Sequence, residues 1–351
     1  MIYFDNAATT PVLRCAWDAM SDAPEGNPSS SHAAGREAKA ALEKARATIA
    51  RCLNCLPGEV YFTSGATEAC NWAVKSICST ADFRHRSMIA SPFEHHAVTE
   101  AVAQYNVPKY TKLDLAQMLV NNETGQIYNI KRFRGNVGLL ACDMTAAIGH
   151  ISVNVEELSL DYAMFGGHKF GAPKGIGALI VREGCPITPL LHGGAQERGE
   201  RGGTVSVPLA CAMAAALEWH TAHMEENEKA IRGVAQELII SLGCHRVDFD
   251  VNLPDGKSSK DYAPHILSIR FPGVYGAALA AALSERGVMV STGSACSSGD
   301  NAASANLMAS GLTEQEALET IRFSFDWYNT RQEADHAARI IADIVPALRR
   351  G

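Results

Sequence analysis

The chain has 351 residues, of which 47% are hydrophobic, so it can bury a large core and divide into two domains. Its formal net charge of -7 argues against nucleic acid as a direct ligand, because such proteins carry a basic surface. It has neither an apolar run long enough to span a membrane nor an N-terminal signal region, so we expect a cytoplasmic protein with ten reduced cysteines. Cys52 and Cys55 form one isolated CxxC pair, which we interpret as a coincidence at a helix end rather than a metal site.

The first third of the chain predicts a turn that can bind phosphate. Residues 33–52 have the composition and the apolar spacing of a helix. A strand expected at 59–63 is followed at once by a glycine turn and a second helix. Free backbone N–H groups and the helix dipole favour an anion at such a helix start, here at Ala66, and Thr67 can add a hydroxyl.

Further strands are expected at intervals up to residue 181. They lie at 87–91, 117–120, 138–142, 162–165 and 176–181. Strands that alternate with helices predict a mostly parallel α/β sheet, whose ligands bind at the carboxyl ends of the strands. The polar residues that follow these strands are Thr67, His95, Asn122, Asp143 and Lys169. Because Lys169 also lies among glycines, where backbone can approach a ligand closely, the pattern predicts a cofactor pocket.

The last third of the chain predicts a second, smaller α+β part. A long helical region at 206–242 closes the first part, and a polar stretch follows it. The later strands and helices are expected at 266–271, 275–286, 288–291, 320–325 and 331–349. We therefore predict a large domain over 15–245 and a small domain over 1–14 and 246–351, with Cys296 in a loop of small residues.

Ten segments in succession resemble the cysteine desulfurases of the NifS/IscS-like branch, which are pyridoxal-phosphate enzymes of fold type I. The segments are YFDNAATTP, GNPSSSH, FTSGATEACN, EHHAV, VNNETG, CDMTAAIG, GGHKFGAPKGIGAL, HGGAQERGERGGT, STGSACSSG and IRFS. The resemblance implies an α/β large domain, with a mixed, mostly parallel sheet flanked by helices, and a smaller C-terminal α+β domain. It also implies a class V aminotransferase relative that works as a homodimer.

The resemblance gives each site residue a role. Lys169 would carry pyridoxal 5'-phosphate as a Schiff base, and Asp143 would keep the pyridine nitrogen protonated. His95 would stack on the ring and assist proton transfer. Asn122 would contact the cofactor oxygen or the substrate, and Arg322 would bind the substrate carboxylate. The phosphate contacts would come from Ala66, Thr67, His168 and, in a partner subunit, Thr204.

The implied reaction converts L-cysteine to L-alanine. Lys169 would take the Cα proton of the substrate, and Cys296 would attack the substrate sulfur as a thiolate. The persulfide formed on Cys296 would then pass to an acceptor protein, such as an iron–sulfur scaffold or a thiolation protein.

Four features depart from the family pattern. Ala146 stands where the family usually has glutamine, and Gly166 stands where it usually has serine. Each change removes one polar cofactor contact, worth about 0.5–1.5 kcal/mol. Residues 325–329 lack a second arginine. The stretches from 95 to 122 and from 127 to 139 are short for parallel crossovers, so we expect one strand or outer helix to be shortened or missing.

Two alternatives to an active desulfurase stay open. The missing polar contacts would also suit a catalytically weakened relative that acts as a binding or regulatory subunit. The other alternative is a pyridoxal-phosphate enzyme of the selenocysteine lyase type. Cys296 in its SGSAC-type segment argues against such a lyase, because a lyase of that type needs no protein thiol.

Overall fold

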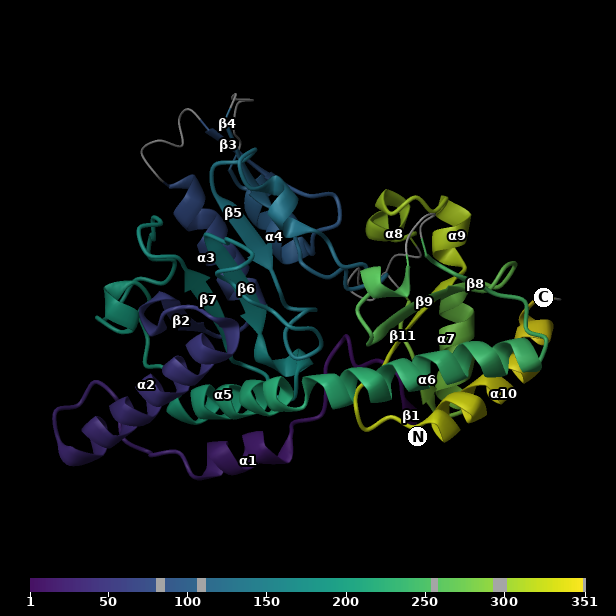
Figure 1. Ribbon diagram of the computed structural model, residues 1–351, viewed down its shortest axis with the longest axis horizontal. Helices are drawn as coiled ribbons and strands as arrows, with labels where there is room; N and C mark the ends of the chain where they lie inside the picture. Colours follow the sequence, from purple (N-terminus) through teal and green to yellow (C-terminus); the bar gives the residue numbers. More distant parts are fainter. Residues whose placement is uncertain (80–85, 106–111, 254–257, 293–301, 350–351) are drawn as a thin grey trace. The chain divides into compact units, whose positions relative to one another are not determined.

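The computed structural model describes residues 1–79, 86–105, 112–253, 258–292 and 302–349 (Figure 1). The chain divides into two compact units. The large unit comprises Pro11–Leu119 and Asn129–His223, and the small unit comprises Met1–Thr10, Val120–Tyr128 and Met224–Gly351. Residues 120–128 and 224–245 thus pack with the small unit, although the predicted boundaries place them in the large domain. The predicted domain boundaries stay a prediction.

A mixed six-stranded sheet lies at the centre of the large unit, in the order β2-β7-β6-β5-β4-β3. Its strands are β2 (Val60–Thr63), β3 (Arg86–Ala90), β4 (Lys112–Ala116), β5 (Leu140–Asp143), β6 (Tyr162–Gly166) and β7 (Gly177–Val181). Strands β3 to β6 are parallel, and β7 runs antiparallel to both β2 and β6. The carboxyl ends of β2 to β6 therefore share one edge, which confirms the predicted mixed, mostly parallel sheet.

The helices of the large unit are α1 (Arg14–Ser21), α2 (Ala33–Leu53), α3 (Ala66–Cys78), α4 (His96–Ala103) and α5 (Val207–Ala222). Helices α3 and α4 bury Trp72, Ile77 and Val98 against side chains of the sheet. Helices α1 and α2 pack against α5, whose small buried residues, such as Ala212 and Ala216, permit a close approach (Figure 1). Among the described residues, no helix is both long enough and apolar enough to cross a membrane.

The strand predicted at 117–120 is wrong in position, because the paired strand is β4, at Lys112–Ala116. Beyond β4 the side chains of residues 117–119 remain buried, and the Gln117 and Leu119 amides still donate to the β5 carbonyls of Ala141 and Asp143, at 3.0 and 2.9 Å, so hydrogen bonding to β5 continues past the end of the strand. Residues 117–139, all of them described, join β4 to β5 through a short 3-10 helix, η3 (Ile130–Phe133), and contain no α-helix. This connection without an α-helix agrees with the expectation that one strand or outer helix is shortened or missing.

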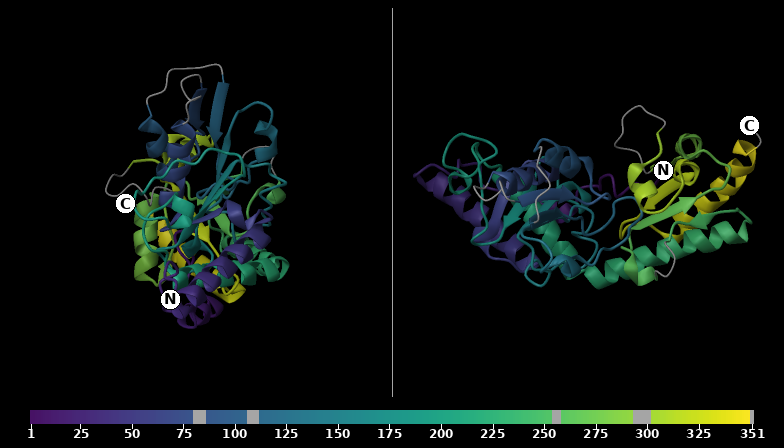
Figure 2. Two further views of the ribbon diagram at one scale, coloured as in Figure 1. Left: turned by 90° about the vertical axis from the view of Figure 1, so that its left-hand side faces the viewer. Right: turned by 90° about the horizontal axis from the view of Figure 1, so that it is seen from above.

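The small unit contains two small sheets. Strands β1 (Ile2–Tyr3) and β10 (Val288–Met289) are parallel, and β8 (Asp250–Val251), β9 (Ile266–Arg270) and β11 (Thr320–Ser324) form an antiparallel sheet in the order β11-β9-β8. The helices are α6 (Met224–Cys244), α7 (Gly276–Glu285), α8 (Ala305–Ala309), α9 (Glu314–Leu318) and α10 (Arg331–Leu348). Helices α6 and α10 lie side by side (Figure 2).

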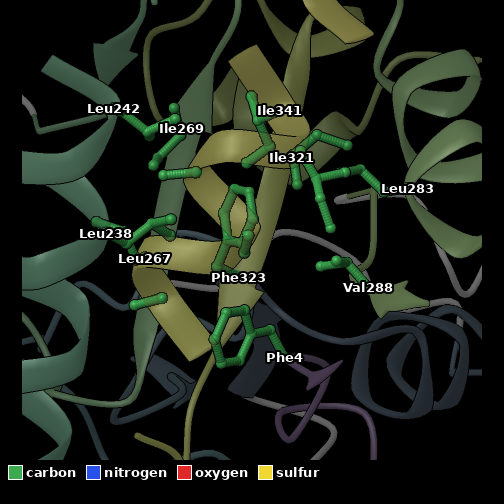
Figure 3. Close-up of a cluster of buried hydrophobic side chains, with 14 of the residues drawn as sticks. Phe4, Leu238, Leu242, Leu267, Ile269, Leu283, Val288, Ile321, Phe323 and Ile341 are labelled. Atoms are coloured by element: carbon green, nitrogen blue, oxygen red, sulfur yellow. The ribbon is translucent and has the colours of Figure 1, made fainter. Parts of the chain in front are cut away.

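One apolar core holds the small unit together. Phe4, which follows β1, and Ile269 and Phe323 from the antiparallel sheet meet Leu238 of α6 and Ile341 of α10 (Figure 3). Burying such side chains supplies most of the free energy that opposes chain entropy.

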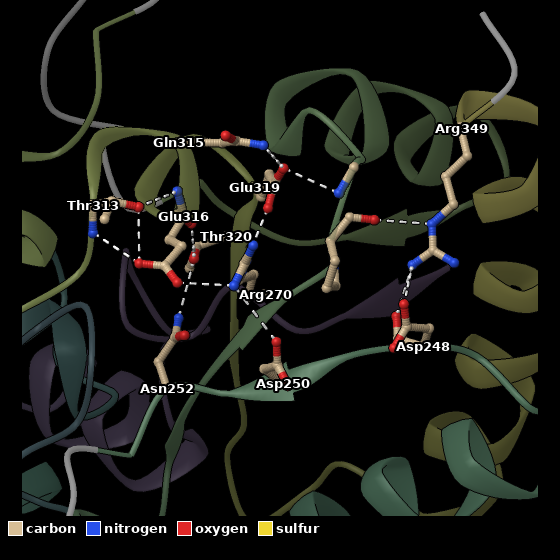
Figure 4. Close-up of polar contacts among 12 residues, drawn as sticks. Asp248, Asp250, Asn252, Arg270, Thr313, Gln315, Glu316, Glu319, Thr320 and Arg349 are labelled. Carbon is tan, nitrogen blue, oxygen red and sulfur yellow. Dashed lines mark hydrogen bonds and ion pairs between the residues drawn. The ribbon is translucent and has the colours of Figure 1, made fainter.

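An ion-pair network ties α9 to the antiparallel sheet. Arg270 of β9 contacts Glu316 (Nη1–Oε1, 2.9 Å) and Glu319 (Nε–Oε2, 2.8 Å), as Figure 4 shows. Glu319 Oε1 also accepts a hydrogen bond from the Gly273 amide at 3.0 Å. Because Glu319 directly precedes β11, these contacts fix the start of that strand.

A buried ion pair fixes the glycine-rich loop of residues 193–204 to helix α2 within the large unit. Arg46 of α2 and Glu197 of the loop are 2% and 6% exposed, and they form two hydrogen bonds of 2.7 and 2.9 Å. Glu197 Oε2 also accepts from the Phe62 amide at 2.8 Å. Glu197 and Arg198 have positive φ angles of 44° and 63°, a conformation that non-glycine residues adopt only when their surroundings impose it.

We expect Arg46→Met to destabilise the protein by about 3–5 kcal/mol, because it leaves the Glu197 carboxylate buried without its partner. Urea unfolding followed by circular dichroism measures the change. Arg14→Met is the control, since Arg14 forms an exposed ion pair with Asp18 and should hardly change the unfolding midpoint. Equal, small effects of the two substitutions would contradict the expectation.

Candidate active site

Four of the predicted site residues lie at the same edge of the large sheet. Asp143 ends β5, and Lys169 ends the 3-10 helix η4 (Gly167–Lys169), which directly follows β6. His95 precedes α4 at its N-cap position, and Thr67 lies in the first turn of α3. The shared edge follows from the parallel pairing of β3 to β6, as the sequence predicts.

His95, Asp143 and Lys169 are close enough to interact electrostatically. Burial lowers the pKa of His95, the charge of Asp143 opposes that shift, and the charge of Lys169 adds to it. His95 Nδ1 accepts a hydrogen bond from the Ala97 amide at 3.1 Å, so the neutral ring carries its proton on Nε2. A neutral imidazole in this position can exchange a proton with a bound ligand.

The start of α3 forms a cradle for an anion. Its N-cap residue, Gly65, provides no side-chain cap, so the first amides of the helix are available to a ligand. A Cβ atom on Gly177 would come within 2.7 Å of Gly65 Cα, and one on Gly166 within 3.2 Å of the Ala66 nitrogen. These two glycines therefore let the turn pack closely on β6 and β7. Gly166, a departure from the family, thus has a packing role here.

His168 also borders the cradle. Its Cδ2 atom would be 3.6 Å from a Cβ atom on Gly166. Burial, together with the charges of Lys169 and Lys174, lowers the pKa of His168 to about 4. The ring is therefore neutral at pH 7 and can donate a hydrogen bond to an anion.

A second ion pair links the cradle to the 193–204 loop. Arg201 forms two hydrogen bonds with Glu68 of α3, at 2.8 and 3.0 Å, and Glu68 Oε2 accepts from the Ser64 amide at 2.7 Å. Burial alone would raise the pKa of Glu68, but these hydrogen bonds lower it, so the carboxylate is charged. Thr204, at the end of the same loop, is exposed in this chain.

Two buried residues near the site are not among those that the sequence pattern identifies. Glu94 is 7% exposed, and neither of its carboxylate oxygens has a hydrogen-bond partner among the described residues. Burial and the charge of Asp143 raise the pKa of Glu94 well above its ordinary value, although the nearby Met118 backbone opposes the shift. His150 Nε2 donates to the Lys169 carbonyl at 2.9 Å. This hydrogen bond holds the backbone of Lys169 in place.

The small unit holds Arg322 and Asn122. Arg322 of β11 is buried, and its Nη1 and Nη2 donate to the Asn122 carbonyl at 2.9 Å and to Asp5 Oδ1 at 3.0 Å. Arg322 Nε and Asn122 Oδ1 are both buried with no hydrogen-bond partner among the described residues. Such groups indicate a ligand with a complementary acceptor and donor, since leaving them unpaired is costly. The sequence pattern predicted that Asn122 directly follows a strand. In the structure it lies instead in the 120–128 segment, which does not directly follow a strand.

Cys296 lies at 293–301, outside the described residues.

We expect His150 to make the large unit sensitive to acid. The pKa of His150 is lowered from 6.5 to about 4, mainly by burial and also by the Lys169 charge, although the hydrogen bond to the Lys169 carbonyl opposes the shift. The unfolded chain therefore binds more protons between pH 6.5 and 4, so stability falls as the pH falls through this window. The full loss from this group is about 3 kcal/mol.

Thermal unfolding measured from pH 7 to pH 4 tests this expectation. His150→Gln keeps an N–H donor for the Lys169 carbonyl but does not titrate, so its unfolding temperature should fall less steeply. The control is His336→Gln, at an exposed position of α10. If His150→Gln and the wild type showed the same pH dependence, the buried neutral imidazole would be excluded as its source.

Comparisons with known proteins agree with this geometry. The family model described as aminotransferase class-V matches residues 2–116 and 108–336. A cysteine desulfurase IscS from Methanosarcina thermophila is 33% identical over 99% of this chain and 93% of its own length. One from Dictyoglomus turgidum is 32% identical, with 99% and 95% covered.

Solved structures lead to the same family. A NifS-like protein is 33% identical and superposes with a TM-score of 0.88 over 99% of this chain and 100% of its own. SspA, solved in complex with cysteine, is 28% identical, with a TM-score of 0.78 and 94% and 100% covered. This chain therefore belongs to the cysteine desulfurases of the class-V aminotransferase family.

Proposed function

We propose that the enzyme binds pyridoxal 5'-phosphate and converts L-cysteine to L-alanine, with the sulfur passing to Cys296 as a persulfide. The observation that carries this proposal is the convergence of His95, Asp143 and Lys169 at the sheet edge that also holds the anion cradle. Chemistry on a phosphorylated cofactor needs an amine, a carboxylate and an anion site in one place.

The residues present fit this cofactor. Lys169 supplies the amine for its covalent attachment, and Asp143 supplies the carboxylate for its ring nitrogen. The open amides at Ala66 and Thr67, with the neutral His168, suit its phosphate. When bound, the cofactor supplies an electron sink for negative charge at the substrate Cα.

The substrate proposal rests on Arg322 and Asn122. The unpaired Arg322 Nε suits a carboxylate, and the unpaired Asn122 Oδ1 suits an ammonium group. Together they match the two charged ends of an amino acid. The relative SspA, solved with cysteine, supports L-cysteine as that amino acid.

Each protein group then has one task. Lys169 takes the proton from the substrate Cα, and the neutral His95 can carry protons to and from the ligand. The Cys296 thiolate forms a bond to the substrate sulfur while the carbon–sulfur bond breaks, and that electron pair stays on the carbon. Protonation of the carbon gives alanine, so no external oxidant is needed.

The proposal includes a cytoplasmic homodimer and a sulfur-acceptor protein. The exposed Thr204 suits a contact with a partner subunit's cofactor phosphate. The cysteines in the described ranges are all free thiols, which suits a reducing compartment. The acceptor would be a protein of iron–sulfur assembly or thiolation.

Lys169→Ala should abolish the near-visible absorbance that the wild type shows after incubation with pyridoxal 5'-phosphate and gel filtration. Lys39→Ala, at an exposed position of α2, should keep it. A wild type that stays colourless after reconstitution would rule out the enzyme and favour the binding or regulatory subunit.

Cys296→Ala should reduce sulfide release from L-cysteine with dithiothreitol to background and leave the cofactor absorbance intact. Cys244→Ala is the control, because Cys244 is an exposed free thiol at the end of α6. Undiminished turnover in Cys296→Ala would refute the persulfide step and favour the selenocysteine lyase type.

A further inference from the structure

Asp5, in the N-terminal segment YFDNAATTP, has no role in the proposed function, yet it contacts the residue that would bind the substrate carboxylate. Asp5 Oδ1 accepts a hydrogen bond from Arg322 Nη2 at 3.0 Å. The side chains of Arg322 and Asp5 are 5% and 23% exposed, so water and salt screen this ion pair only in part. The carboxylate of Asp5 therefore acts on any charged ligand that approaches Arg322.

The backbone holds Asp5 on the same face of the small unit as Arg322. The N-terminal segment runs parallel to β11 at this point, and Asp5 is paired with Ser324. The Ser324 amide donates to the Phe4 carbonyl at 2.7 Å, and the Asn6 amide donates to the Ser324 carbonyl at 3.3 Å. Because alternate residues of a strand share one face, Arg322, two residues before Ser324, presents its side chain beside that of Asp5.

The charge of Arg322 is largely compensated within the small unit. Besides Asp5, the buried carboxyl group of Glu123 interacts with this charge, and it accepts from the Ser304 hydroxyl at 2.6 Å. Burial raises the pKa of Glu123 to about 7, although the Ser304 hydroxyl, the Arg322 charge and the Asn306 side chain oppose the shift. Glu123 is therefore partly ionised at pH 7. Together, Arg322, Asp5 and Glu123 carry no net positive charge.

Arg322 nevertheless keeps one donor for a ligand. Its Nη1 and Nη2 atoms donate to Asn122 and Asp5, whereas Nε is buried without a partner among the described residues. A ligand carboxylate at Nε is attracted by Arg322 and repelled by Asp5. An ammonium group on the same ligand is attracted by Asp5 and can donate to the buried, unpaired Asn122 Oδ1. The arrangement thus favours a zwitterion over a carboxylate that has no ammonium group.

We propose that Asp5 is a specificity-determining residue, which makes the Arg322 site select zwitterionic amino acids and disfavour ligands with a net negative charge. This inference rests on the proposed role of Arg322 as the residue that binds the substrate carboxylate. L-cysteine carries no net charge at neutral pH, whereas an amino acid with an acidic side chain, such as L-aspartate, carries one additional negative charge. Asp5 thus disfavours such amino acids relative to L-cysteine.

Propionate and L-alanine are matched probes of this selection, because propionate is L-alanine without its ammonium group. The rise in unfolding temperature with ligand concentration gives both dissociation constants, on full-length protein incubated with pyridoxal 5'-phosphate. Asp5→Asn keeps an oxygen for Arg322 Nη2 but removes the negative charge, so propionate should bind about tenfold more tightly. L-alanine binding should change less, since its ammonium group loses an attraction while its carboxylate loses a repulsion.

The direction of the change separates charge selection from a structural role. If Asp5 only held Arg322 in place, Asp5→Asn would weaken the binding of both ligands. That result, or an unchanged ratio of the two dissociation constants, would overturn the proposal. The control is Asp250→Asn, which removes a largely exposed carboxylate 3.7 Å from Arg270 in the same unit and should leave the ratio unchanged.

Two further variants complete the test. If Asp5→Asn does not fold, Glu123→Gln removes the other negative charge and keeps an acceptor for Ser304; an unchanged ratio in that variant would also count against the proposal. Arg322→Met tests the proposed function on which the inference rests. If it changed neither dissociation constant, the substrate role of Arg322 would fail, and the inference with it. If it weakened both while Asp5→Asn left their ratio unchanged, only the charge selection by Asp5 would fail.

Discussion

The parallel pairing of β3 to β6 is the constraint on which the rest of the site depends. Asp143, the last residue of β5, pairs with Met164, two residues before β6 ends at Gly166, so neighbouring parallel strands end close to one another at the same edge. Residues that follow different strands are thereby brought to one edge, although 74 positions separate His95 from Lys169 in the sequence. The hydrogen bonds between the parallel strands align these residues, so their side chains lie close together without long extensions.

Burial then decides which groups at this edge carry charge. The pKa values of His95, His150 and His168 are all lowered by burial, and that of Glu94 is raised well above its ordinary value. These groups are therefore neutral at pH 7, and each serves as a hydrogen-bond donor or acceptor rather than as an ion. Burial also excludes water from this edge, which strengthens the electrostatic interactions of any charged ligand bound there.

The departures from the family pattern have different physical explanations. Gly166 lacks the hydroxyl of the serine that the family usually has at this position. It also lacks a Cβ atom, which lets the Ala66 amide at the start of α3 approach β6 closely. The connection from β4 to β5 can omit its outer helix because residues 120–128 pack with the small unit instead. There they present Glu123 to Ser304 and Asn122 to Arg322. Nothing in the structure explains the alanine at position 146.

The sequence alone determined the strands that are buried on both faces and the motif residues at their ends. β2 and β6 are short apolar runs closed by glycine turns, Asp143 is the last residue of β5, and Lys169 ends the short η4 turn that follows β6. Strand β4 was expected too late in the chain, because the buried run at 117–120 continues past the end of the strand. Glu94 belongs to the EHHAV segment, but nothing in that segment shows its burial beside Asp143, His150 carries no local pattern, and Glu123 lies 181 positions from Ser304. Only the tertiary structure could pair them, because contacts of that kind depend on the whole fold.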